Sequence, residues 1–226
     1  MSIRKISFVQ EEFHHLYNRG NDKRKIFHDE QDYKYFIKLL YLSNSQSNFK
    51  SYNLDRIKNF DVFSLENKDP IVSIGAYVLM PNHFHLLITQ KSDNGISKFM
   101  QKLCTAYAMY YNKKYKRTGS LFEGKFKSQH LNTDNYLRYI FSYIHLNPIK
   151  LIQKDWKEKG IIDFNKSIKF LNDYRYSSYV DYEQNFIRKE SKIINKNSFP
   201  DYFPTQQIFK KEIFDWLKYN LVLGKT

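Results

Sequence analysis

The order of apolar and polar positions along the first 150 residues predicts a regular series of strands and helices. Strands are expected where short stretches are continuously apolar or alternate with period two and end at turn residues. These stretches cover residues 13–17, 71–80, 83–89 and 126–131. Only Pro81 and Asn82 separate the two middle strands, so those strands should form an antiparallel hairpin.

Three further stretches carry apolar residues at helical spacing, over residues 29–43, 96–115 and 134–146. Thr133 and Asp134 are N-cap candidates for the third helix. That helix should stop at Asn147, because the residue before a proline avoids the helical region. The resulting order is β-α-β-β-α-β followed by an extra helix, which predicts an α+β, ferredoxin-like core with an antiparallel sheet.

The remaining segments carry weaker signals. Residues 44–70 are polar and rich in Asn, Ser and Lys, so we expect an insertion loop, with room for a small helix, inside a domain covering 1–150. Residues 151–226 should form a C-terminal extension with a last helix over 206–221. No apolar stretch approaches the roughly 20 residues that a membrane span needs, and no signal peptide begins the chain, so we expect a cytoplasmic protein.

The charge of the chain points to a polyanionic partner. Lys and Arg number 37 against 23 Asp and Glu, which gives a formal net charge of +14. The 19 Tyr and 19 Phe include rings that could stack on single-stranded bases, although most should fill the core. The single cysteine, Cys104, excludes a disulfide framework and a zinc site built from several cysteines.

Half of the net charge lies between residues 96 and 130, a stretch that contains eight basic residues and one acidic residue, Glu123. The glycines of this stretch, together with Phe122 and Phe126, favour a nucleic-acid-binding loop over a merely solvated surface. The basic residues concerned are Lys98, Lys102, Lys113, Lys114, Lys116, Arg117, Lys125 and Lys127.

Two pairs of residues could carry chemistry. His83 and His85 should lie on the same face of a strand, where two imidazoles can share a divalent ion that still needs a third ligand. Tyr143 and Asn147 should share one face of the third helix. An Asn oxygen suits Mg²⁺ or Mn²⁺, and a tyrosine beside that metal could attack phosphorus. Each pair could equally have a purely structural role, with no metal bound and no reaction at the tyrosine.

Several stretches, in this order along the chain, resemble the REP-associated tyrosine transposases, a branch of the single-tyrosine HUH transposases of the insertion-sequence 200-like type. HUH denotes His, a bulky hydrophobic residue and His, here His83-Phe84-His85. No single motif is specific, but together they cover most of residues 13 to 180. The motifs are HLYNRGN (15–21), AYVLMPNHFHLLI (76–88), GSLFEGKFKS (119–128), YIHLNP (143–148) and DYRYSSY (173–179).

The resemblance implies a metal-assisted strand transfer on single-stranded or hairpin DNA. His83, His85 and Asn147 would hold Mg²⁺ or Mn²⁺, although imidazoles also suit Zn²⁺. Tyr143 would be the nucleophile, rather than Tyr139 on the same helix, and would form a 5′-phosphotyrosine intermediate.

The same resemblance implies a cytoplasmic, nucleoid-associated protein of bacterial type and a possible homodimer. It also implies a DNA-binding set made of Arg19, Asn21, Lys113, Lys114, Lys116, Arg117, Lys125 and Lys127. The 44–70 insertion looks longer than the corresponding family loop, and the tail beyond about residue 182 matches no part of the family.

Two alternatives remain open at this point. The chain could be a non-catalytic regulator of the same fold that binds nucleic acid, because ferredoxin-like sheets stack bases on strand aromatics in other proteins. It could also be a small metallohydrolase of free nucleotides, a function for which the basic loop would be unnecessary.

Overall fold

The computed structural model describes residues 8–47, 61–183 and 187–223. Within them, four strands form one antiparallel sheet in the order β2-β3-β1-β4. The two central strands pair with each other although α1 and β2 separate them along the chain, which confirms the predicted ferredoxin-like α+β core. The strands are β1 Phe13–Arg19, β2 Val72–Met80, β3 His83–Gln90 and β4 Lys127–His130.

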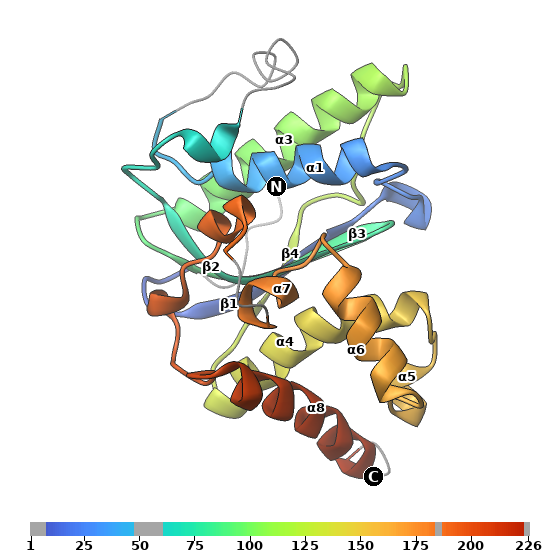
Figure 1. Ribbon diagram of the computed structural model, residues 1–226. Coiled ribbons are helices and arrows are strands. Elements are labelled where there is room, and N and C mark those ends of the chain that lie inside the picture. The colour runs from blue at the N-terminus through green and yellow to red at the C-terminus, as the bar shows by residue number, and fades with distance from the viewer. Residues whose placement is uncertain (1–7, 48–60, 184–186, 224–226) are drawn as a thin grey trace.

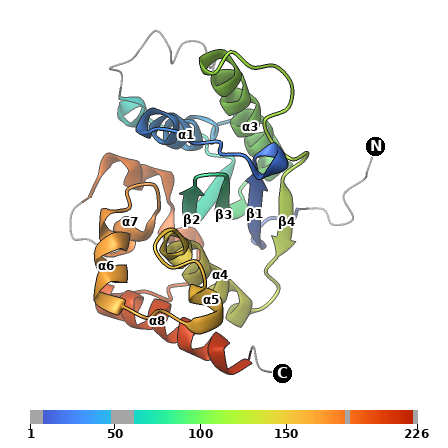
Figure 2. The same cartoon turned by 90° about the vertical axis from the view of Figure 1, so that its right-hand side faces the viewer.

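One face of the sheet is covered by α1 (Glu30–Leu42) and α3 (Gly95–Lys114), which lie side by side above it in Figures 1 and 2. Asp29 caps α1 by accepting a hydrogen bond from the backbone nitrogen of Asp32. Aromatic side chains fill this first core. Phe36, Phe84 and Tyr107 are fully buried there, together with aliphatic residues of the strands.

The other face is covered by α4 (Asp134–Leu146) and by the C-terminal extension (Figure 2). The extension contributes α5 Trp156–Lys159, α6 Phe164–Asp173, α7 Tyr179–Glu183 and α8 Gln206–Leu223. Of these, only α8 was predicted. The extension shares one apolar core with α4 and β2, so it forms part of the sheet's second face. No helix in the described part of the chain is long and apolar enough to cross a membrane.

The predicted boundaries agree with the structure to within a few residues. β1 continues two residues beyond its predicted end, to Arg19, which therefore pairs with His83. About half of the 44–70 insertion, residues 48–60, lies outside the described residues. Its described part contains one short helical turn, η2. The short helical turns are η1 Asn21–Lys23, η2 Val62–Ser64, η3 Asn147–Leu151, η4 Lys189–Ile193 and η5 Lys196–Ser198.

His145 fastens α4 to the sheet and to the extension. Its Nε2 lies 2.8 Å from the hydroxyl of Ser178, which also accepts a hydrogen bond from the backbone nitrogen of Tyr77 in β2. The imidazole is fully buried among aromatic rings, including those of Phe141 and Phe209. Burial lowers the pKa of His145 to about 3.

We expect this histidine to contribute to acid sensitivity. Its pKa is lower in the folded than in the unfolded protein, so its contribution to stability is complete above pH 6.5 and is lost as the pH falls toward 3. His145→Phe removes the titrating group and leaves Ser178 its bonds to Tyr77.

Between pH 5.5 and 4, the free energy of unfolding should fall less steeply in this variant than in the parent, by up to about 1.4 kcal/mol per pH unit. Urea unfolding curves at several pH values measure the slopes. His15 and His83 titrate in both proteins, so equal slopes would contradict the prediction.

Candidate active site

Strand pairing gathers four side chains on the face of the sheet that α4 covers. In the register of β1 and β3, Tyr17 lies opposite His85 and Arg19 lies opposite His83. Alternate residues of a strand share a face, so His15 and Tyr17 stand beside the two histidines of β3. The rings of His83 and His85 are 5.0 Å apart, and that of Tyr17 is 5.7 Å from His85.

The turn between β2 and β3 is held by the loop that follows β1. The backbone nitrogen of Gly20 donates to the oxygen of Asn82 at 2.9 Å, and the Asn82 amide donates to the oxygen of Lys23 at 3.1 Å. A Cβ at Gly20 would lie 2.4 Å from the oxygen of Arg24, so this close approach requires glycine.

The same turn orients the ring of His83. The side-chain oxygen of Asn82 lies 2.6 Å from Nδ1 of His83. Because an amide oxygen only accepts hydrogen bonds, Nδ1 must carry the proton, and the lone pair on Nε2 is left for another partner.

The Nδ1 atom of His85 also has a hydrogen-bond partner, because Nε2 of His15 lies 2.9 Å from it. Burial lowers the pKa of His15 to about 4, with a smaller contribution from the charge of Lys157. Burial and the charge of Lys150 lower the pKa of His83 to about 4, and burial sets that of His85 well below its ordinary value. All three imidazoles are therefore neutral at neutral pH, the form that binds metals.

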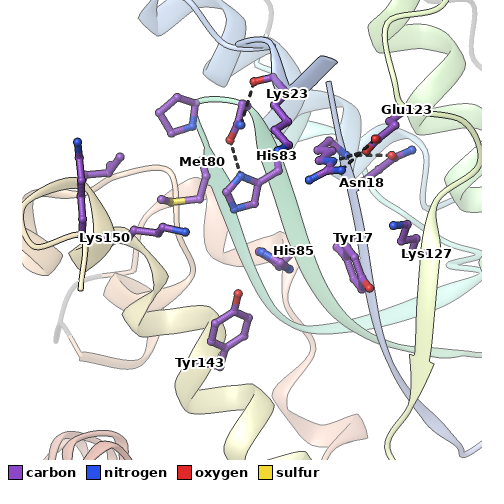
Figure 3. Close-up of a pocket in the computed structure, with 15 residues that line it drawn as sticks. Tyr17, Asn18, Lys23, Met80, His83, His85, Glu123, Lys127, Tyr143 and Lys150 are labelled. Atoms are coloured by element: carbon purple, nitrogen blue, oxygen red, sulfur yellow. Dashed lines mark hydrogen bonds and ion pairs between the residues drawn. The ribbon is translucent and has the colours of Figure 1, made fainter. Parts of the chain in front are cut away.

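Tyr143 points from α4 toward His85 in Figure 3. The two rings meet edge to face with their centroids 5.4 Å apart, and the ring of His15 is 6.0 Å away. Burial raises the pKa of the Tyr143 phenol, while the Asn147 amide and the charge of Lys150 act in the opposite direction.

Asn147 follows Tyr143 by one helical turn and is only 3% exposed. Its side-chain oxygen is buried and has no hydrogen-bond partner among the described residues. An unpaired buried oxygen costs about 1–3 kcal/mol unless a ligand or water completes it.

These residues offer a mixed set of metal donors. No three His, Cys, Asp or Glu side chains of the described residues lie close enough together to hold a metal ion. The set consists instead of the imidazoles of His83 and His85 and the unpaired oxygen of Asn147. The amide oxygen suits Mg²⁺ or Mn²⁺, whereas the two imidazole nitrogens also suit Zn²⁺.

A cleft of about 600 Å³ opens beside His83, His85 and Tyr143 (Figure 3). Glu123 is the one carboxylate in its described lining and forms an ion pair with Arg19, so the remaining cations give the cleft a positive surface. The basic residues of the lining are Arg19, Lys23, Lys127, Lys150 and Lys154.

Most of the predicted DNA-binding residues lie outside this cleft. Lys113 and Lys114 end α3 on the other face of the sheet, where the Lys114 ammonium pairs with Asp29 at 2.8 Å and with the fully buried Asp32 at 2.7 Å. Lys114 therefore joins α1 to α3. None of Asn21, Lys116, Arg117 and Lys125 lines the cleft.

Sequence reasoning missed several residues of the site. His15 and Tyr17 follow a period-two pattern in the predicted first strand, but their neighbours depend on the pairing register of β1 with β3. Asn82 was expected in the turn between the two middle strands, but the sequence indicated no role for its side chain. Lys150 and Lys154 belong to a segment with no pattern that separates cleft lysines from solvated ones.

Comparison with known proteins identifies the class of protein. A family model described as "Transposase IS200 like" matches residues 14–147, more than half of the chain. This segment contains the histidines of β3, Tyr143 and Asn147. The chain belongs to the IS200-like transposase family, which in general terms cuts and transfers DNA.

Solved structures add two more distant likenesses. A REP-associated tyrosine transposase bound to a REP hairpin is 13% identical with a TM-score of 0.46, covering 84% of this chain and 90% of its own. The tRNA(His) guanylyltransferase of Saccharomyces cerevisiae is 12% identical with a TM-score of 0.38, covering 89% and 86%. No curated protein matches the chain. At these identities, neither structure informs on chemistry.

The buried imidazoles should resist protonation in the metal-free protein. At pH 5.5, well above the lowered pKa values of His15 and His83, the ¹⁵N NMR signals of their ring nitrogens should show neutral rings. Single His→Gln variants assign the signals. A doubly protonated His83 at pH 5.5 would contradict the burial described here.

Proposed function

We propose that this transposase cuts single-stranded DNA with Tyr143 as its nucleophile and with a divalent metal held by His83, His85 and Asn147. The proposal rests on one observation, which is that the side chains of the proposed nucleophile and metal ligands lie close together. The phenol of Tyr143 in α4 meets the imidazole of His85 edge to face at a cationic cleft. Asn147, directly after α4, carries an unpaired amide oxygen and lies close enough to His83 to act on its pKa. All four residues come from one chain, so the proposal requires no second copy, and the homodimer stays a prediction.

The residues of the chain supply the steps of strand transfer. Bound metal would polarise a non-bridging oxygen of the scissile phosphate. The phenolic oxygen of Tyr143 forms a bond to phosphorus while the bond from phosphorus to the 3′ oxygen breaks. The phenolic proton passes to water, and the departing 3′ oxygen takes a proton from water. The 5′-phosphotyrosine link retains the bond energy, so a second 3′-hydroxyl can rejoin the strand without ATP.

The cleft supports a single-stranded substrate. Lysines on both of its sides can follow the phosphates, and the ring of Tyr17 in its lining can stack on a base. Because the similar REP-associated transposase was solved with a REP hairpin, a hairpin with single-stranded flanks is the first substrate to test. The exposed residues of the basic loop, Lys116 and Lys125, would contact the flanking DNA.

Tyr143→Phe should abolish the covalent adduct with labelled hairpin DNA and leave DNA binding within about twofold, because only the attacking oxygen is removed. Denaturing gels measure the adduct, and fluorescence anisotropy measures binding. Tyr17→Phe is the matched control, since this second tyrosine also lies beside His85 and should keep the adduct.

An adduct that survives in Tyr143→Phe but disappears in Tyr17→Phe would move the nucleophile to β1. Binding without an adduct in the parent protein, with or without metal, would favour the non-catalytic regulator instead.

His83→Ala and Asn147→Ala should each weaken Mn²⁺ binding at least about tenfold, because each removes a donor from a set of three. Electron paramagnetic resonance of free Mn²⁺ measures the affinity without DNA. His130→Ala is the control, since this histidine of β4 contacts Glu12 and His14 outside the cleft. Unchanged affinity in both site variants would refute the ligand set and leave the test of Tyr143 unaffected.

A further inference from the structure

The short helix α5 brings a lysine of the C-terminal extension to the nucleophile. Trp156 begins this helix, and its ring is buried in the core shared with α4. The anchored tryptophan sets the position of the next residue, Lys157. Its Nζ lies 4.0 Å from the centroid of the Tyr143 ring, within the range of a cation–π contact.

Lys157 forms no ion pair among the described residues, and its ammonium contacts the rings of Tyr143 and Trp156. The carboxylate of the adjacent Glu158 acts on it through its charge alone. Lys159, on the same helix, differs in that it pairs with Asp155 at 2.7 Å. Much of the Lys157 side chain is exposed, yet desolvation of its ammonium end lowers its pKa. An unpaired cation is thus held against the aromatic ring rather than in open water.

We propose that Lys157 is a further catalytic residue, which stabilises the negative charge that Tyr143 and the scissile phosphate carry during attack. This inference rests on the proposed role of Tyr143 as the nucleophile. The family model ends at Asn147, so Lys157 lies beyond the part of the chain that it matches.

The physical basis is a difference between the resting and the reacting phenol. A cation above a ring is attracted to its electron-rich face, and the attraction grows as the phenolic oxygen loses its proton. An interaction that strengthens on the way to the transition state accelerates the reaction. Burial disfavours the charged form of Tyr143, while the Asn147 amide and the charge of Lys150 act in the opposite direction. The ammonium of Lys157 differs from both in lying over the ring itself.

The proton balance of the step is unchanged by this role. As the bond from Tyr143 to phosphorus forms and the bond to the 3′ oxygen breaks, the phenolic proton goes to water and the 3′ oxygen receives one from water. Lys157 keeps its own protons throughout and acts through its charge.

Three variants separate charge from bulk. Lys157→Met keeps the stem without the charge, Lys157→Arg keeps a cation that can stack, and Lys159→Met removes a paired neighbour as the control. Single-turnover adduct formation on the labelled hairpin gives the rate, with Tyr143→Phe as the blank. We expect Lys157→Met to be about 100-fold slower, Lys157→Arg to stay within about tenfold, and Lys159→Met to be unchanged.

DNA affinity distinguishes this role from simple phosphate binding. The dissociation constant of Lys157→Met should stay within about threefold of the parent, so the loss appears in the rate at saturating DNA. An equal rate in Lys157→Met and the parent would overturn the inference. A faster rate in Lys157→Met would also overturn it, because α5 would then shield Tyr143 from the substrate. A weaker DNA affinity with an unchanged rate at saturating DNA would overturn it as well.

A substrate with sulfur in place of the departing 3′ oxygen tests whether Lys157 stabilises the attacking phenol of Tyr143 or the leaving group. Sulfur leaves without protonation, so this substrate should not restore the rate of Lys157→Met if the lysine acts on the nucleophile. Full restoration would assign the lysine to the leaving group and overturn the role on Tyr143.

The contact between Lys157 and the Tyr143 ring can be tested by ¹⁹F NMR, which does not require DNA cleavage. With 3-fluorotyrosine at position 143, the ¹⁹F signal should shift in Lys157→Met and stay in place in Lys159→Met. No shift would overturn the contact. If the parent protein forms no adduct while the ¹⁹F shift is present, the proposed function fails and the catalytic role fails with it, although the contact stands.

Discussion

The pairing of β1 with β3 is the constraint on which the rest of the site depends. Side chains of a strand alternate between faces, so a slip of one residue would move every side chain of β1 to the opposite face. His15 would then enter the aromatic core beneath α1 and α3, and the buried Leu16 would take its place beside His85. The apolar pattern of two separate cores, one on each face, fixes the register and thereby places the histidines under α4.

The core elements could be predicted because each carries a local signal. α1 and α4 have side-chain caps, the helices have apolar stripes, and the hairpin of β2 and β3 has a two-residue turn. α4 ends where predicted, but the expected reason is wrong, because Asn147 keeps helical backbone angles and the chain continues directly into η3. The pairs His83 with His85 and Tyr143 with Asn147 are also local, since strand and helix periods place each pair on one face. That the two pairs meet depends on how α4 packs, and the sequence suggested this only through family resemblance.

The missing parts depend on long-range packing. Lys114 belongs to a basic run, and its partners Asp29 and Asp32 belong to another helix, so charge counting could not separate it from a DNA-binding lysine. Lys150, Lys154 and Lys157 come from a segment without a clear period. Their positions follow from η3, α5 and the burial of Trp156, which depend on the shared core rather than on local propensity.

The anchored turn at Asn82 has a consequence for the cost of binding. Strands provide the histidines, a helix provides the tyrosine, and backbone hydrogen bonds from Gly20 and Ile26 hold the turn between β2 and β3. A site assembled on such rigid supports loses little conformational entropy when a ligand arrives. Under the proposed function, the flexible partner in the encounter is the nucleic acid, whose unpaired nucleotides would adopt the shape of a cleft that is already formed.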